Sequence, residues 1–194
     1  MQDSKRILTA AVMAAFLALT ALPPLSAAKD PSASGPVVAG TWEHHHARFT
    51  YFGITSLYSC DGLESDIRAL LLHLGARKDA TVSAYGCPGG SSVPSRNAIV
   101  DLDFYSLAPS ADVNAANSVQ ARWTPVVVDS THPNSMGRGD CELIDEMKDI
   151  LSKNFSLRDL SYRTTCVPHQ VGIDDFSVKA EVLKALPAAV AAKG

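Results

Sequence analysis

The side chains most able to do chemistry form a short run, Glu43-His44-His45-His46. If this run lies on a β-strand, His44 and His46 face the same side, and imidazoles at that spacing can hold a copper or zinc ion. His132 and His169, which fall in predicted loops, are candidates for further ligands. The alternative is a polar patch in water, because two ligands fall short of a complete metal site.

A pair of carboxylates is the second candidate. Asp101 and Asp103 bracket Leu102 in a strand-like run, and paired carboxylates can act as general acid and base in a hydrolase. The alternation of that run, however, assigns the aspartates to water and the apolar residues to the core. His73 lies in a predicted helix and is expected to be a half-buried surface residue. The sequence contains neither a Gly-x-Ser-x-Gly nucleophile motif nor a phosphate-loop lysine.

Four cysteines complete the reactive side chains: Cys60, Cys87, Cys141 and Cys166. An even number of cysteines in an exported chain predicts disulfides, and three connectivities are then possible. A zinc site is disfavoured because the sequence has no Cys-x-x-Cys pair.

The start of the chain predicts export. Lys5 and Arg6 precede an apolar run at 7–22, and small residues follow at 26–28, which is the order of regions in a signal peptide cleaved after residue 28. The apolar run has about 16 residues, fewer than the roughly 20 of a membrane-spanning helix, which argues against an uncleaved anchor. We therefore expect a periplasmic or secreted protein. Its predicted parts are a signal peptide at 1–28, a flexible leader at 29–40, a single domain at 41–187 and a frayed tail at 188–194.

The charge of the mature chain disfavours two classes of partner. The whole chain has 17 basic and 20 acidic residues; removing Lys5, Arg6 and Asp3 leaves 15 and 19, a net charge of −4 with neutral histidines. Proteins that bind nucleic acid or anionic membrane surfaces carry an excess of basic residues instead. No later segment is long and apolar enough to span a membrane.

Hydrophobic periodicity predicts the elements that position these residues. Helices are expected to begin at the capping residues Asp61 and Asp140, and to end at Gly75 and near Phe155. Alternation predicts strands at 49–54, 81–87, 98–107, 119–128, 157–166 and 176–183. Pro125 favours an edge position or a bulge for the fourth of these strands.

The two halves of this pattern share the order strand, cysteine, helix, strand, cysteine, strand. Four apolar helix positions and the cysteines recur at an offset near 80 residues: Leu63 with Leu143, Ile67 with Met147, Leu70 with Ile150, and Leu71 with Leu151. We interpret this as a duplicated βαββ unit; the alternative is coincidence between two generic helix–strand pairs.

The lengths of the elements favour one disulfide connectivity. A helix of about 15 residues is roughly 22 Å long, and a returning strand of about seven residues covers nearly the same distance. The end of the strand therefore returns to the start of the helix, which pairs Cys60 with Cys87 and Cys141 with Cys166. Each bridge would close a loop of about 26 residues and stabilise the fold by roughly 3.5 kcal/mol.

Several short stretches carry a resemblance. They are Phe52-Gly53-Ile54-Thr55, Tyr58-Ser59-Cys60-Asp61-Gly62-Leu63, Leu74-Gly75-Ala76-Arg77, Gly139-Asp140-Cys141-Glu142-Leu143 and Cys166-Val167-Pro168-His169-Gln170. Together they look like an uncharacterised family of small exported proteobacterial proteins, over residues 40–186. The resemblance implies export and a bacterial origin, and it implies no activity.

These observations predict an α+β fold. We expect a two-layer sandwich with a largely antiparallel sheet, two helices on one face and two disulfides. The expected function is that of a non-enzymatic periplasmic or secreted protein that binds another envelope or extracellular protein. The alternatives are a copper- or zinc-binding protein that uses His44 and His46, and a hydrolase of unrecognised type.

Overall fold

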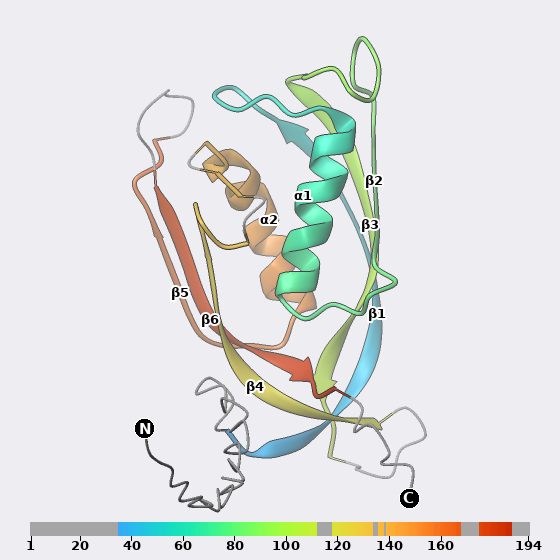
Figure 1. Cartoon of the computed structure of the whole chain (residues 1–194), viewed down its shortest axis with the longest axis vertical. Helices are drawn as coiled ribbons and strands as arrows, with labels where there is room; N and C mark the ends of the chain where they lie inside the picture. The colour runs from blue at the N-terminus through green and yellow to red at the C-terminus, as the bar shows by residue number, and fades with distance from the viewer. Residues whose placement is uncertain (1–34, 112–117, 134–135, 138, 168–174, 188–194) are drawn as a thin grey trace, which may run out of the picture. The chain divides into compact units, whose positions relative to one another are not determined.

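The computed structural model describes residues 35–111, 118–133, 136–137, 139–167 and 175–187. The predicted signal peptide, His169 and the predicted tail at 188–194 lie outside the described residues. The elements follow in the order β1 (Val37–Phe52), α1 (Cys60–His73), β2 (Thr81–Tyr85), β3 (Asn97–Pro109), β4 (Ser118–Asp129), α2 (Cys141–Asn154), β5 (Leu157–Thr164) and β6 (Phe176–Ala185) (Figure 1).

The strands form one six-stranded sheet in the order β2-β3-β1-β4-β6-β5, and every neighbouring pair is antiparallel. This confirms the predicted α+β class with a largely antiparallel sheet. The elements are two successive βαββ sets, as predicted: a first repeat from β1 to β3 and a second repeat from β4 to β6. Each repeat contributes three adjacent strands to the sheet.

The two repeats are related by an approximate two-fold axis. β1 and β4 pair over Val37–Thr41, and in this register Ala39 lies opposite Gln120, its own counterpart 81 positions later. A residue that pairs with its own counterpart marks where a two-fold axis crosses an antiparallel pair. The same separation of 81 positions relates several other residues: Val38 to Val119, Trp42 to Trp123, Cys60 to Cys141, and Arg77 to Arg158.

The sheet opens beyond this short junction. β1 pairs with β3 up to Phe52, and β4 pairs with β6 up to Asp129, but β1 and β4 pair over only five residues each. Figure 1 shows the two halves of the sheet diverging, with α1 and α2 between them. Pro125 pairs with Glu181 on the β6 side and lies past the β1 pairing, so its missing N–H breaks no bond to β1.

The main core lies between the helices and the inner face of the sheet. Both helices bury residues at helical spacing, and the inner residues of the strands complete the core; the largest fully buried side chains include Tyr51, Phe104, Phe176, Leu63, Ile67, Leu143 and Met147. A second, smaller cluster forms around the β1–β4 junction: Leu107, Ala121, Trp123 and Leu183, with Val38, Trp42 and Val119 packed against them.

Both predicted disulfide pairings are confirmed. Cys60 is bonded to Cys87 and Cys141 to Cys166, each with a Cα–Cα distance of 6.0 Å. Each bridge lies within one repeat and joins the start of its helix to the region after the following strand. None of the described helices is long and apolar enough to cross a membrane.

The predicted leader at 29–40 is wrong at its end. Residues 37–40 form the first part of β1, because β4 supplies backbone partners to this weakly patterned stretch. A pairing with a strand some 80 residues away is invisible in local composition.

The predicted helix starts are partly wrong. α1 is capped by Ser59, whose Oγ accepts a hydrogen bond from the Gly62 N–H at 3.0 Å, so Asp61 lies in the first turn instead. Asp140 precedes α2 as predicted, but its carboxylate makes no cap bond to the helix. It accepts the Gly137 N–H at 2.5 Å and the Tyr58 hydroxyl, and therefore ties the loop before α2 to the first repeat.

Candidate functional site

The histidine run lies on β1, and the register of the sheet places His44 and His46 beside the predicted carboxylates of β3. Both histidines are exposed. His44 Nε2 lies 3.0 Å from Asp103 Oδ1, and the His44 ring stacks on Tyr105 with 4.7 Å between centroids. The structure thus brings the first two candidate sites together on one exposed face.

The two aspartates of β3 belong to different pairs. Asp101 accepts from Arg48 Nε at 2.5 Å and Nη2 at 2.8 Å, and from the Tyr85 hydroxyl at 3.2 Å. The Arg48 guanidinium lowers the pKa of Asp101, so this carboxyl is ionised near neutral pH and is a poor general acid. Asp103 is bonded to His44 instead, so the two carboxylates do not share a proton or a substrate position.

The exposed face does not assemble a complete metal centre. Over the described ranges, the structure contains no group of three or more His, Cys, Asp or Glu residues that could hold a metal ion. Within these ranges, which do not include His169, His44 and His46 therefore have no third donor beside them.

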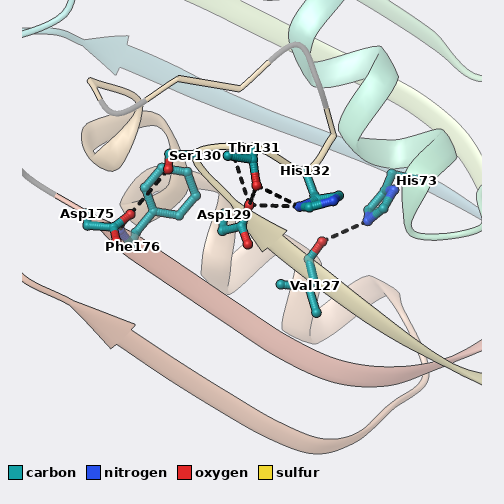
Figure 2. Close-up of polar contacts among 8 residues, drawn as sticks. All are labelled: His73, Val127, Asp129, Ser130, Thr131, His132, Asp175 and Phe176. Atoms are coloured by element: carbon teal, nitrogen blue, oxygen red, sulfur yellow. Dashed lines mark hydrogen bonds and ion pairs between the residues drawn. The ribbon is translucent and has the colours of Figure 1, made fainter.

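His132 and His73 lie near one another at the end of β4 (Figure 2). Asp129 Oδ1 accepts the Thr131 N–H at 2.8 Å and the Thr131 hydroxyl at 2.6 Å, and it lies 3.1 Å from His132 Nδ1. These hydrogen bonds, led by that from the Thr131 hydroxyl, lower the pKa of Asp129 to about 2. His73 Nε2 lies 2.9 Å from the Val127 carbonyl oxygen, and burial lowers the pKa of His73.

This arrangement is a turn and differs from a catalytic triad. In a triad the two ring nitrogens of the histidine serve different partners, a carboxylate and a nucleophile. Here the Thr131 hydroxyl and the Asp129 carboxylate both meet His132 Nδ1, at 2.8 and 3.1 Å. A carboxylate that accepts from the N–H two residues later forms an Asx turn, which holds the chain after β4.

Three of the stretches that carried the family resemblance, at 52–55, 58–63 and 139–143, meet near the N-terminus of α2. Glu142 Oε2 accepts the backbone N–H groups of Ile54, Thr55 and Ser56, at 2.9, 3.0 and 3.4 Å. The Ser56 hydroxyl in turn donates to the Gly139 carbonyl oxygen. These contacts fasten the loop after β1 to the second repeat and have a structural role.

An apolar groove lies between α2 and the last two strands. It has a volume of about 200 Å³ and is lined by five residues of α2 and four of the strands. The apolar ones and Tyr162 are Ile144, Leu151, Leu157, Leu160, Tyr162 and Val178, and the polar ones are Lys148, Asp149 and Ser152 of α2. The side chain of Leu160 is among the most exposed large apolar groups described, at 50%. The Tyr162 hydroxyl donates to Asp145 Oδ1 at 2.6 Å, which ties one end of the groove to α2.

A bulge in β5 turns Leu160 into the groove. The pairing with β6 shifts between Arg158 and Ser161, and Asp159 adopts a positive φ of 51°. Aspartate tolerates this left-handed conformation better than most residues do. Sequence reasoning missed the groove, although the spacing of Leu157, Leu160 and Tyr162 departs from two-residue alternation and was a signal of the bulge.

The two edge strands of the sheet, β2 and β5, differ in their hydrogen bonds to the helices. In the first repeat, Glu64 of α1 accepts the Ala84 N–H of β2 at 2.8 Å, and Arg68 donates to the carbonyl oxygens of Lys78 and Ala80 at 3.0 and 3.1 Å. In the second repeat, no side chain of α2 is bonded to the backbone of β5 among the described residues. Among the described residues, the edge of β2 is therefore covered by α1, whereas the backbone of the edge strand β5, beside the groove, is bonded to no side chain of α2.

The fold and these surfaces define an α+β protein built from two disulfide-bonded βαββ repeats, with an open edge strand beside an apolar groove. Comparison of the chain with protein-family models, curated proteins and solved structures gave no significant match.

Proposed function

We propose that this is an exported, non-enzymatic protein that binds another protein of the cell envelope or the extracellular space. One observation carries the proposal: in the part of the chain that the structure describes, β5 is an edge strand whose backbone is bonded to no helix side chain, and it lies beside the apolar groove. An exposed edge presents unpaired N–H and C=O groups, and an extended segment of a partner can satisfy them by adding a strand.

The dimensions of the groove favour a peptide over a small molecule. Pockets for drug-sized ligands span roughly 300–1,000 Å³, and this groove has about 200 Å³. Alternate side chains of an added strand face the same side, so an apolar side chain of the partner would enter between Ile144 and Leu160. Backbone pairing supplies affinity in this mode, and the groove supplies selectivity.

Export is supported by the sequence and is compatible with the disulfides. The predicted signal peptide precedes the domain, and two disulfides suit an oxidising compartment. Fractionation of a bacterial host followed by mass spectrometry tests this part separately. We expect the protein outside the cytoplasm with Lys29 as its first residue; a full-length cytoplasmic chain would refute export.

The binding mode is tested by selecting linear peptides from a random library on the purified mature protein. Leu160→Lys places an ammonium at the groove, and Leu57→Lys is the matched control, because the two leucines are 50% and 51% exposed. Selected peptides should lose affinity for Leu160→Lys by about tenfold or more, because an unpaired charge in an apolar contact is costly. They should bind Leu57→Lys normally and should slow amide hydrogen exchange in β5.

Two results would overturn the proposed mode. One is the failure of repeated selections to yield any peptide that binds. The other is equal binding to both lysine variants without protection of β5, which would place the contact elsewhere.

A further inference from the structure

A second cavity lies at the C-terminal end of α1, apart from the groove. Its volume is about 390 Å³, and its walls include an aromatic ring, three cationic side chains and the end of the described chain: Trp42, Arg77, Lys78, Lys184, Leu186 and Pro187. None of these residues lines the groove beside β5. The volume falls within the range of roughly 300–1,000 Å³ that is typical of small-molecule sites.

Lys184 is the central cation of this cavity. Its stem crosses Gly75, where a Cβ atom would lie 2.8 Å from Lys184 Cγ, and Gly75 has a positive φ of 93°. Glycine is therefore required there for two reasons, the close approach and the backbone conformation. The Lys184 ammonium donates to the His73 carbonyl oxygen at 2.5 Å.

No carboxylate of the described residues is paired with the Lys184 ammonium. Among the described residues, the ion pairs do not include Lys184. Burial lowers the pKa of Lys184, as expected for an ammonium that has left water without gaining a counter-ion. An ammonium has three N–H donors, so two remain for a ligand beside the bond to His73.

Arg77 is held in place beside this cavity. Its guanidinium carbon lies 3.5 Å from the centroid of Tyr105 and 6.0 Å from that of Trp42. Asp79 fixes it further, with bonds of 2.8 Å from Nε and 2.6 Å from Nη2. Three cationic side chains, Arg77, Lys78 and Lys184, thus line the cavity in a chain whose net charge is −3.

We propose that this cavity binds a small organic anion, with its charged headgroup at Lys184 and Arg77 and its apolar body against Trp42 and Pro187. Carboxylate and phosphate headgroups share the required chemistry, since both accept charge-assisted hydrogen bonds from ammonium and guanidinium groups. The site is independent of the proposed peptide groove, and either can fail alone.

The approximate symmetry of the molecule supplies a matched control. Arg158 lies over Trp123 at 3.7 Å, as Arg77 does near Trp42, but Arg158 does not line the cavity. Lys179 is an exposed lysine on the same strand as Lys184. Arg158→Gln and Lys179→Met therefore repeat the chemical changes of Arg77→Gln and Lys184→Met outside the site.

The experiment is a ¹H–¹⁵N chemical-shift titration of the mature protein with phenyl phosphate, with benzoate and with neutral benzyl alcohol. At least one anion should shift the amides of residues 75–78 and 184–186, and benzyl alcohol should not. Lys184→Met and Arg77→Gln should each raise the dissociation constant about tenfold, and the two control variants should leave it unchanged. Preference for phenyl phosphate or for benzoate identifies the headgroup.

Circular dichroism and melting establish that each variant is folded, and Arg77→Gln serves alone if Lys184→Met does not fold. The proposal is refuted by the absence of shifts at these amides up to about 10 mM anion, which would place the dissociation constant above that concentration. It is also refuted if the site variants bind as tightly as the controls, or if benzyl alcohol binds as well as the anions.

Discussion

Most of the side chains that could do chemistry are hydrogen-bonded to side chains on the neighbouring strand. The register of β1 with β3 brings Asp103 within hydrogen-bond distance of His44 and places Asp101 opposite Arg48, so hydrogen-bonded pairs form along the exposed face. The Asp129 carboxylate likewise accepts hydrogen bonds from the Thr131 N–H and hydroxyl within its own turn. Exposed pairs of this kind contribute little stability, and their main effect here is to occupy the carboxylates.

The first prediction at this scale concerns metal binding. We expect micromolar Cu²⁺ or Zn²⁺ to leave the melting temperature of the mature protein unchanged, because His44 and His46 have no third ligand in the described structure and His44 already bonds Asp103. A site saturated at 100 times its dissociation constant would stabilise the fold by about 2.7 kcal/mol, which a melt would detect. A rise that the double variant His44→Ala/His46→Ala abolishes would show that the copper or zinc alternative is correct.

The second prediction concerns Asp66. Burial, together with the charge of Asp140, raises the pKa of Asp66 from 3.8 to about 6. The folded state thus holds a proton that the unfolded state has lost, and stability falls as pH rises from about 4 to 6. Above pH 6 the cost of ionisation is constant, and for this half-buried group it is about 1–2 kcal/mol after allowance for solvent screening.

Asp66→Asn should therefore stabilise the protein by about 1–2 kcal/mol at pH 7.5 and have little effect at pH 3.5. Urea unfolding at both pH values measures this, with Asp149→Asn, an exposed change on α2, as the control. An equal effect of Asp66→Asn at both pH values would show that ionisation is not the cause.

At the scale of elements, the two repeats use their helices differently. α1 places Glu64 and Arg68, four residues apart, against the backbone at β2, and so covers an edge that would otherwise attract other chains. The counterpart of Glu64 is Asp145, which bonds the Tyr162 hydroxyl and leaves the backbone of β5 uncovered. The two helices thus differ in their side-chain contacts: α1 binds backbone groups at its edge strand, whereas Asp145 of α2 binds a side chain of β5.

Removing the Glu64 carboxylate should open the edge of β2. We expect Glu64→Ala to lower stability by about 1 kcal/mol, because the Ala84 N–H loses its acceptor. Amide hydrogen exchange at Ala84 should accelerate correspondingly. Glu64→Gln keeps an acceptor oxygen and should behave like the native protein; if it exchanges as fast as Glu64→Ala, the hydrogen bond is not what protects this amide.

At the scale of the whole molecule, two similar repeats are joined by a short junction and closed by separate disulfides. The β1–β4 pairing is brief, and the cluster around Trp123 and the contacts of Glu142 supplement it. The disulfides stabilise each repeat within itself and do not bridge the junction. Cohesion between the repeats therefore rests on packing and hydrogen bonds.

The two disulfides should contribute nearly equally to the free energy of unfolding. Their cysteines are 27 and 25 positions apart, and loops of that size are worth roughly 3.5 kcal/mol each in the chain-entropy model. Urea unfolding of Cys60→Ala/Cys87→Ala and of Cys141→Ala/Cys166→Ala should show similar losses. Losses that differ by more than about 2 kcal/mol would show that one repeat is held together mainly by other contacts.

The features that could be predicted from the sequence are those that depend on local patterns. The two helices, five of the strands and the end of β1 follow from hydrophobic periodicity, which reports on neighbours within one element; the strand predicted at 49–54 is only the end of Val37–Phe52. The cysteine pairing was also predictable, because a helix and the strand after it have similar lengths and must return the chain to its starting point. The repeated order of elements was visible in the sequence because the apolar helix positions and the cysteines recur at nearly the same separation in both repeats.

The remaining features were decided by contacts between distant residues. Residues 37–40 became a strand because β4 pairs with them. His44 is hydrogen-bonded because β3 places Asp103, two residues from the residue opposite His44, within reach of its ring. The groove arose from a bulge in β5, and the cavity from the meeting of β1, the end of α1 and the end of β6. Local sequence alone determined which elements form, since periodicity is local; tertiary structure decided which surfaces remain open, because that depends on the register and packing of segments far apart in the chain.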